Sequence, residues 1–316
     1  MAPIVTLTMN PALDVSTETP EVRPSDKLRC APPHYQPGGG GINVARVITA
    51  LGGRATPIFP VGGPSGDLLC ALLHETGIAF EAIRIAGATR ESFTVDERST
   101  GRQYRFVLPG PTVTGEEQAH VLEAIAALPD LPDYIVASGS LPPGVAPDFY
   151  ARLGGAARRI GARFILDCPG EVLAASAGAG ALLIKPNLLE LEAAAGHPLA
   201  DDRARITAAR ALITAEVAEA VVISRGVDGA LLVTAGETTA LPADLVPVRS
   251  TVGAGDSMVG AITLGLARGE ALHDAVRYGM AAGAAAVMSG ASELAHREDT
   301  ERLLQEAMVR AAVAPA

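Results

Sequence analysis

The chain has 316 residues, of which 48% are apolar and only 3% aromatic, and it carries 35 acidic against 25 basic side chains. A chain of this length buries roughly three quarters of the surface that its unfolded form exposes, which excludes a disordered or fibrous protein. The net charge of -10 argues against a partner that is nucleic acid or an anionic membrane, because binding to either needs a basic face. We expect a globular protein that meets anionic ligands with a few local charges.

The N-terminal sequence MAPIVTLTMNPALD has neither a basic segment nor a long apolar one, and it alternates like a strand. The most apolar stretch, Tyr278 to Gly290, is shorter than the about 20 apolar residues that cross a bilayer, and it predicts a closely packed buried helix. Cys30, Cys70 and Cys168 are odd in number and lack CxxC spacing, which indicates reduced thiols. The sequence therefore predicts a cytoplasmic protein without a membrane partner.

The chain has only two lysines, Lys27 and Lys185, but 23 arginines. A lysine that remains in such a chain is expected where a compact ammonium cannot be replaced by a planar guanidinium.

Short apolar runs alternate with Ala-rich helical segments along most of the chain. This alternation predicts an α/β fold with one doubly wound, mostly parallel sheet sandwiched by helices, over residues 1–316. The predicted strands are Ile4 to Thr8, Pro57 to Val61, Tyr134 to Ala137, Phe164 to Asp167, Leu182 to Lys185 and Val221 to Ser224.

Two segments interrupt the alternation, at about residues 14–32 and 92–108. The first is polar and rich in proline, and the second places alternating sequences on both sides of a Ser-Thr-Gly turn, which is typical of a hairpin. We predict that they form a small antiparallel β lid over the core.

Four glycines, Gly38 to Gly41, lead into an apolar-periodic helix. Backbone without Cβ lets a ligand approach closely, and a helix N-terminus offers free N–H groups. The cluster fits neither the dinucleotide nor the Walker A pattern. A small polar or anionic ligand is the favoured interpretation, and a flexible turn is the alternative.

A second cluster, STVGAGDS at Ser250 to Ser257, places Gly253, Ala254 and Gly255 before a helix, where their amides could bind a phosphoryl oxygen. Asp256 follows directly. An acid in the first helical turn ordinarily stabilises the helix dipole. Beside an anion site a carboxylate repels phosphate unless it accepts a proton from an attacking hydroxyl, so we interpret Asp256 as a general base.

In LLIKPNLLE, a predicted strand ends at Lys185, and Asn187 and Glu190 fall on one face of the next helix. An amide and a carboxylate there could hold hydrated Mg²⁺. A capping box is equally compatible with the spacing.

GGGGINVAR, KPNLLE and STVGAGDS, in this order, resemble the ribokinase-like (PfkB) carbohydrate kinases over nearly the whole chain. TLTMNPALD, KLRC and SGSLPPGV resemble the phosphosugar branch, and most of all the minor bacterial 6-phosphofructokinases. The resemblance implies the ribokinase-like fold and transfer of phosphate from ATP to the 1-hydroxyl of fructose 6-phosphate.

By the same resemblance, Asp256 is the base, and the amides from Gly253 through Ala254 and Gly255 to Asp256 form the anion hole. The resemblance also implies the substrate-binding residues Asp14, Lys27, Arg29, Gly39, Asn43 and Arg90. Lys185, Asn187, Ser224 and Gly226 would bind ATP, and Glu190 would act on Mg²⁺ through water.

Similar kinases also bind K⁺, through groups that fall here on Ser250, Val252, Ala286, Ser289 and Ala291. Ser289, Ala291 and Glu293 replace the Asn, Gly and Arg of the nearest pattern, so K⁺ binding is expected if the ligands are backbone carbonyls. Arg225 stands where the family usually has an apolar residue.

The branch consists of dimers whose lids interlock, so a homodimer through the lid is expected. The alternatives are a 1-phosphofructokinase or tagatose-6-phosphate kinase and, more remotely, a non-catalytic sensor of nucleotides or sugar phosphates. Both lysines fall in the implied site, which predicts that Lys27→Arg and Lys185→Arg each impair turnover or binding.

Overall fold

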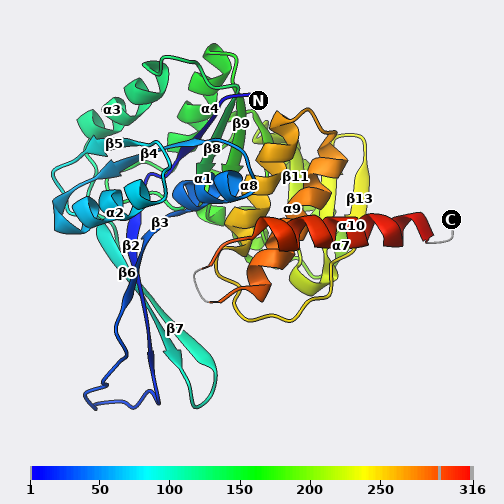
Figure 1. Ribbon diagram of the computed structural model, residues 1–316. Helices are drawn as coiled ribbons and strands as arrows, with labels where there is room; N and C mark the ends of the chain where they lie inside the picture. The colour runs from blue at the N-terminus through cyan, green and yellow to red at the C-terminus, as the bar shows by residue number, and fades with distance from the viewer. Residues whose placement is uncertain (1, 291–292, 314–316) are drawn as a thin grey trace.

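The computed structural model describes residues 2–290 and 293–313. Its main body contains a nine-stranded sheet in the order β13-β12-β11-β10-β9-β8-β1-β4-β5 (Figure 1). All neighbours from β11 to β5 pair in parallel, whereas β12 and β13 add an antiparallel edge. The strands are β1 (Ile4–Leu7), β4 (Thr56–Val61), β5 (Glu81–Arg84), β8 (Tyr134–Ser138), β9 (Arg163–Asp167), β10 (Ala181–Ile184), β11 (Ala218–Ser224), β12 (Ala230–Thr234) and β13 (Thr238–Leu241).

Helices cover both faces of this sheet, because successive side chains of each buried strand point to opposite faces and both sets are apolar. One face packs against α1 (Gly40–Ala50), α8 (Ala254–Ala267), α9 (Leu272–Met288) and α10 (Arg297–Val313). The other face packs against α3 (Gly115–Ala126), α4 (Phe149–Arg159), α5 (Gly170–Ala174), α6 (Leu188–Ala195) and α7 (Asp202–Thr214). The remaining helix, α2 (Gly63–Glu75), packs its leucines against β4. The predicted doubly wound, mostly parallel core is confirmed.

The predicted buried helix near Tyr278 is α9, which runs along α8 (Figure 1). Small side chains let the two helices approach closely: a Cβ on Gly279 would lie 2.4 Å from the Ile262 Cγ1 atom. Ala281, Ala282 and Ala285 are fully buried on the same helix. Within the described ranges, no helix combines the length and the apolarity needed to cross a bilayer.

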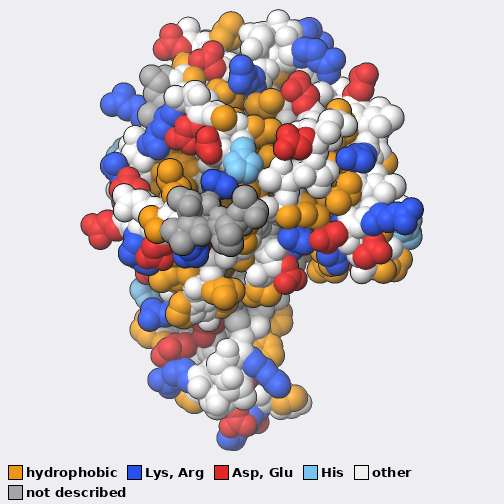
Figure 2. All heavy atoms as spheres, turned by 90° about the vertical axis from the view of Figure 1, so that its right-hand side faces the viewer, with side chains coloured by type: hydrophobic (Ala, Val, Ile, Leu, Met, Phe, Trp, Pro, Cys, Tyr) orange, Lys and Arg blue, Asp and Glu red, His pale blue; other side chains and the backbone are white. Residues whose placement is uncertain are grey.

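A separate four-stranded sheet projects from the body and forms the lid, in the order β3-β2-β6-β7 (Figures 1 and 2). The predicted hairpin is confirmed, because β6 and β7 pair antiparallel around the turn at residues 98–101. The predicted small antiparallel lid is confirmed in the pairs β2–β3 and β6–β7, and a parallel pairing of β2 with β6 joins these two pairs. The lid strands are β2 (Ala12–Thr19), β3 (His34–Gly38), β6 (Arg90–Glu97) and β7 (Arg102–Val107).

The loop of residues 20–33 joins β2 to β3 at the far end of the lid (Figure 1). Lys27, Arg29 and Cys30 lie in this loop and are exposed. On the face drawn in Figure 2, acidic and basic side chains are intermixed.

Candidate active site

Four neighbouring strands of the main sheet end in polar residues at the same edge. Ser138 closes β8, Asp167 closes β9, Lys185 follows β10 directly, and Ser224 closes β11. Because these strands are adjacent and parallel, their carboxyl ends bring the four side chains into one row. This edge is where doubly wound sheets bind ligands.

The first glycine cluster lets the N-terminus of α1 approach that edge. A Cβ on Gly40 would lie 2.2 Å from the Ser138 Oγ atom, and one on Gly41 would lie 2.4 Å from the Leu7 carbonyl oxygen. Gly39, the N-cap residue, has a φ of 115°, which favours glycine. The glycines therefore form a close contact with the sheet, which places Asn43, in the first turn of α1, over the row of strand ends.

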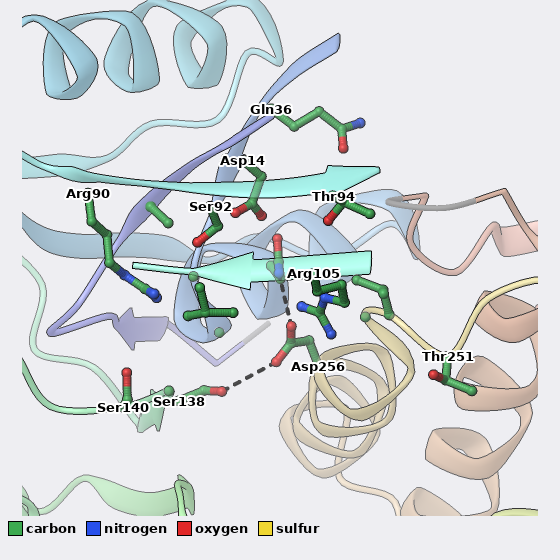
Figure 3. Close-up of a pocket in the computed structure, with 18 of the residues that line it drawn as sticks. Asp14, Gln36, Arg90, Ser92, Thr94, Arg105, Ser138, Ser140, Thr251 and Asp256 are labelled. Carbon is green, nitrogen blue, oxygen red and sulfur yellow. Dashed lines mark hydrogen bonds between the residues drawn. The ribbon is translucent and has the colours of Figure 1, made fainter. Parts of the chain in front are cut away.

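Asp256 lies in the first turn of α8, opposite Asn43. The Asn43 Nδ2 atom donates a hydrogen bond of 2.9 Å to Asp256 Oδ2, and Ser138 Oγ lies 3.5 Å from Asp256 Oδ1 (Figure 3). Gly253 caps the helix with a φ of 76°. The amides of Ala254, Gly255 and Asp256 are in the first turn, where the helix provides no acceptor for them. A carboxylate and a set of free amides thus lie at one point, as the sequence predicts.

The electrostatic surroundings of Asp256 suit a proton acceptor. Burial, together with the negative charge of Asp167, raises the pKa of Asp256 from 3.8 to about 7, although Asn43, Lys185 and Ser138 lower it in part. A general base works best when its pKa lies near the operating pH. The surroundings therefore give Asp256 a pKa that suits proton transfer at neutral pH.

Lys185 is buried, with 5% of its side chain exposed, and its Nζ atom lies 3.3 Å from Asp167 Oδ1. Burial alone would lower the Lys185 pKa, but the carboxylates of Asp167, Glu190 and Asp256 outweigh burial and raise it. A Cβ on Gly255 would lie 3.4 Å from Lys185 Nζ. The ammonium therefore lies beside the first turn of α8, next to the proposed anion hole.

A pocket of about 350 Å³ opens above the row, between the main body and the lid (Figure 3). From the lid, Asp14 on β2, Arg90 on β6 and Arg105 on β7 line it, opposite Asp256 and Ser138. This volume falls within the range of small-molecule sites.

On the lid side of the pocket, one carboxylate, Asp14, lies among arginines. Burial raises the pKa of Asp14 to about 6, and Arg90, Arg105 and Arg46 oppose the rise. The Arg90 guanidinium donates hydrogen bonds of 3.1 Å to the carbonyl oxygens of Asn10 and Leu108. These contacts hold a charged, planar donor at the edge of the pocket.

Asn187 and Glu190 form the capping box of α6. Glu190 N donates to Asn187 Oδ1 at 2.9 Å, and Asn187 N donates to Glu190 Oε2 at 2.8 Å. The alternative that the sequence left open is thus realised. The box uses one oxygen of each side chain. It leaves the side-chain amide nitrogen of Asn187, Nδ2, and the other carboxylate oxygen of Glu190, Oε1, outside it. Glu190 also lines the pocket.

Asn187 pairs with Ser224 in an isolated parallel bridge, and a short 3₁₀ turn, η1 (Gly226–Asp228), follows. These proposed nucleotide-binding residues therefore continue the row beyond Lys185. Arg225 donates to Asp202 Oδ2 and to the Asp228 carbonyl oxygen, both at 2.7 Å. Both partners of this guanidinium belong to the protein itself. These bonds show how an arginine is accommodated at a position where the family usually has an apolar residue.

Two of the predicted K⁺-binding segments lie side by side. The amide nitrogens of Arg249 and Ser250 donate to the Val287 carbonyl oxygen at 2.7 and 3.3 Å, which brings Ser250 and Val252 to the end of α9 with Ala286 and Ser289. Backbone carbonyl oxygens at the end of α9 therefore lie beside Ser250 and Val252. Ala291 lies outside the described residues.

The structure brings most of the predicted substrate and catalytic residues together and leaves two apart. Lys27 and Arg29, exposed on the loop of residues 20–33, are not among the residues that line the pocket of this chain. Within one chain they lie apart from the pocket, because the loop is at the far end of the lid, and their role in binding the sugar phosphate stays a prediction. Among the predicted residues, the pocket is lined by Asp14, Gly39, Asn43, Arg90, Glu190, Val252, Gly253 and Asp256.

Sequence reasoning missed several polar residues of the pocket. Asp167 ends a predicted strand and Ser138 directly follows one, so the convergence of parallel strand ends would have identified them. The lid residues had no such indicator, because their approach to the pocket depends on the pairing of β2 with β6. The missed polar residues are Ser16, Gln36, Ser92, Thr94, Gln103, Arg105, Ser138, Ser140, Asp167 and Thr251.

Comparison with known proteins agrees with this geometry. The model of the pfkB family of carbohydrate kinases matches residues 2–296, and the chain belongs to this family. An ATP-dependent 6-phosphofructokinase isozyme 2 of Mycobacterium tuberculosis is 47% identical over 302 residues, which are 96% of this chain and 89% of that protein. The isozyme 2 of Escherichia coli is 41% identical over 304 residues, which are 96% of this chain and 98% of that protein.

Solved structures show the same similarity. Phosphofructokinase-2 from Escherichia coli in complex with potassium has a TM-score of 0.92 and 40% identity, and the match covers 98% of this chain and 100% of that one. A tetrameric inhibited form of the same enzyme matches the same shares of both chains with a TM-score of 0.91 and 40% identity. Among the relatives found by sequence, a 1-phosphofructokinase of Escherichia coli is 36% identical over 286 residues, which are 90% of this chain and 90% of that protein.

Proposed function

We propose that this protein transfers the γ-phosphoryl group of ATP to the 1-hydroxyl of fructose 6-phosphate and so forms fructose 1,6-bisphosphate and ADP. The observation that carries the proposal is Asp256, a carboxylate with a pKa near neutrality beside the free amides of a helix N-terminus, in a pocket whose far side presents arginines. The names of the most similar relatives support the choice of substrate.

The residues divide the reaction between them. Asp256 accepts the proton of the 1-hydroxyl while the hydroxyl oxygen forms a bond to the γ-phosphorus and the bond to the β,γ-bridging oxygen breaks. The amides from Gly253 to Asp256 stabilise the charge on the transferring group. Lys185, beside Gly255, neutralises the phosphates of ATP, and Asn187, Ser224 and Gly226 hold the nucleotide along the same edge.

The sugar phosphate lies between the lid and α1. Asp14, Gly39 and Asn43 bind its hydroxyls, and Arg90 binds its 6-phosphate, for which a guanidinium is well suited. This arrangement directs the opposite end of the sugar, with its 1-hydroxyl, at Asp256.

Two cations complete the proposed site. Glu190 keeps one oxygen outside its capping box, which fits a contact with Mg²⁺ through water. When bound, Mg²⁺ neutralises charge on the phosphates of ATP. K⁺ fits the oxygens around Ser250, Val252, Ala286 and Ser289, and a relative was solved with potassium.

We also propose that the enzyme works in the cytoplasm as a homodimer through the lid. On the lid, Tyr35 of β3 and Phe106 of β7 stand in one cross-strand row with Val15 and Phe93, and they are exposed by 44% and 56%. A second lid would bury this apolar surface. In such a dimer, the loop of residues 20–33 of one chain would bring Lys27 and Arg29 to the lid of the other. Neither residue lines the pocket of its own chain.

A 1-phosphofructokinase or a tagatose-6-phosphate kinase is the second candidate, since a 1-phosphofructokinase is similar over nine tenths of its length. A sensor without activity is disfavoured, because a sensor gains nothing from a carboxylate directed at phosphate.

A coupled assay of ADP release with fructose 6-phosphate, fructose 1-phosphate and tagatose 6-phosphate tests the proposal. We expect the highest kcat/KM for fructose 6-phosphate. A higher value for either of the other two sugars would establish the second candidate instead, and no turnover with any of the three would favour a sensor.

A further inference from the structure

Arg46 contacts the residue that holds the proposed base, yet it does not line the pocket. It lies on α1 three residues after Asn43 and therefore on the same face of the helix. Its Nη1 atom donates to Asn43 Oδ1 at 3.3 Å and to the Pro37 carbonyl oxygen at 3.2 Å.

These contacts decide which way the Asn43 carboxamide points. A guanidinium only donates hydrogen bonds, so the Asn43 atom that faces Arg46 must be the oxygen. The amide nitrogen then faces Asp256 and donates to its Oδ2 atom at 2.9 Å. The reversed amide would direct its nitrogen at the donors of Arg46 and its oxygen at the carboxylate. Arg46 therefore excludes the reversed orientation.

The orientation of Asn43 matters because it favours one protonation state of Asp256. An N–H donor stabilises the ionised carboxylate, whereas a carbonyl oxygen in the same place would accept a hydrogen bond from the protonated acid. Only the ionised form can take the proton of the sugar hydroxyl.

We propose that Arg46 is a positioning residue that fixes the Asn43 carboxamide with its nitrogen toward Asp256, and so keeps the base ionised and directed into the pocket. This inference rests on the proposed role of Asp256. Arg46 acts through Asn43 and is not among the residues that line the pocket.

Other charged groups also face the relay, by which we mean the hydrogen-bonded series from Arg46 through Asn43 to Asp256. Asp256 faces Asp167 on β9, whose charge favours the protonated acid, and Lys185 after β10, whose charge opposes it. Arg46 faces Asp14 on β2 as well as Asp256, and both carboxylates counteract the lowering of its pKa by burial. The guanidinium remains charged across the range in which Asp256 titrates.

The same guanidinium connects the base to the lid. Pro37 belongs to β3 and pairs with Leu13 of β2, so Arg46 links the root of the lid to the relay from Asn43 to Asp256.

Three variants separate the donor role of Arg46 from its bulk. In Arg46→Gln, the new side chain both donates and accepts hydrogen bonds, so it no longer fixes the orientation of the Asn43 carboxamide. We expect the acidic limb of the plot of kcat against pH to move up by about one pH unit. The turnover of this variant should fall about tenfold near pH 6 and recover to within about threefold of wild type near pH 9. In Arg46→Lys, which keeps a donor-only group, the limb should stay near that of wild type.

Arg54→Gln is the matched control, because Arg54 is exposed just after the same helix and should leave the profile unchanged. Coupling supplies the second test: in an Asn43→Ala background, Arg46→Gln should shift the limb by less than about 0.3 pH units, since the relay is already broken. Melting curves of each variant establish that it folds, and Arg46→Met replaces Arg46→Gln if the latter does not.

An acidic limb that stays in place in Arg46→Gln, with a loss of turnover that is uniform over pH, would overturn the proposal. A shift that persists unchanged in the Asn43→Ala background would also overturn it, since Arg46 would then act without Asn43. Failure of the proposed function looks different: the wild-type enzyme itself would not phosphorylate any of the three sugars.

Discussion

The two sides of the pocket differ in how completely one chain builds them. On the side of the main body, the polar groups are largely buried and already have partners. Asn43 donates a hydrogen bond to Asp256, and Lys185 forms an ion pair with Asp167. On the side of the lid, Phe106 and Val107 are exposed by more than half, and Lys27 is exposed far from the pocket. The reacting groups are therefore preorganised inside a single chain, whereas the lid still has a surface to cover.

This difference assigns separate tasks to the two sides. Groups that act on the transferring phosphate need fixed positions, which burial and close packing provide. A lid on a separate sheet can contact the substrate and a second copy of the chain at once. We expect substitutions in the main body to lower kcat and those in the lid to raise the KM for the sugar.

The largest effect is expected for Asp256→Asn. Loss of the base should lower kcat by roughly 10²–10⁴-fold, because proton transfer to a positioned group contributes about that much, while ATP affinity stays close to normal. Steady-state kinetics and calorimetric titration with ATP measure the two quantities. Asp274→Asn is the control: Asp274 is also an acid in the first turn of a helix, α9, but it is exposed. A fully active Asp256→Asn would refute the assignment of the base.

A smaller but clear loss is expected for Lys185→Arg. The buried ammonium lies 3.3 Å from Asp167 Oδ1 and close to Gly255, so a larger planar guanidinium does not fit without displacing them. We expect kcat/KM for ATP to fall roughly 10–100-fold. Wild-type kinetics in this variant would contradict the fit argument.

Lys27→Arg is the matched comparison for Lys185→Arg. Its side chain is exposed, so the guanidinium has room, and we expect at most a several-fold rise in the KM for fructose 6-phosphate. The sequence alone treats the two lysines alike, and kinetics of the two variants side by side would show whether burial separates them.

Phe106→Asp tests whether the lid forms the dimer interface. A charge in the apolar surface of β7 should dissociate the dimer and raise the KM for the sugar about tenfold, with a smaller change in the KM for ATP. Light scattering after gel filtration gives the mass, and kinetics give the KM values. Leu131→Asp provides the control, since Leu131 is similarly exposed, by 50%, but lies just before β8, at the amino end of the sheet. A Phe106→Asp protein that keeps the wild-type mass would remove the lid from the interface.

The smallest effect concerns stability and follows from the raised pKa of Asp256. That pKa is about 7 in the folded protein against 3.8 for an unperturbed aspartate, so between these values the folded state binds more protons and stability falls as the pH rises. Asp256→Asn removes the buried charge. Its melting temperature should exceed that of wild type by a few degrees at pH 8 and equal it below about pH 3, where the carboxyl of wild type is protonated in both the folded and the unfolded state. A difference that does not vary with pH would contradict the raised pKa.

Much of the main body follows from local sequence. Each of the six predicted strands is present, with ends that differ by a few residues at most, because continuous apolar runs between helices have few other arrangements. The strands of the main sheet that were not predicted are β12 and the two edge strands, β5 and β13. β5, EAIR, is short and half-exposed, and β13, TTAL, is also short, so their patterns resemble loops. β3 begins with two exposed residues, His34 and Tyr35, and continues through a proline.

The sequence by itself determined the class of the fold and the positions of the proposed base and anion hole, Gly253 to Asp256. Gly39 and Gly253 are required by left-handed backbone at two helix N-termini, and Asp256 follows one of them, so these positions are set within a few residues of chain. Only the tertiary structure decided what depends on distant segments. Three such features join elements that are far apart in the chain: the parallel pairing of β2 with β6, the contact of Asp167 with Lys185, and the relay from Arg46 through Asn43 to Asp256. The exposure of Lys27 likewise depends on where its loop lies relative to distant segments. No local pattern encodes such contacts, because their free energy comes from packing that exists only once the sheet and the lid have formed.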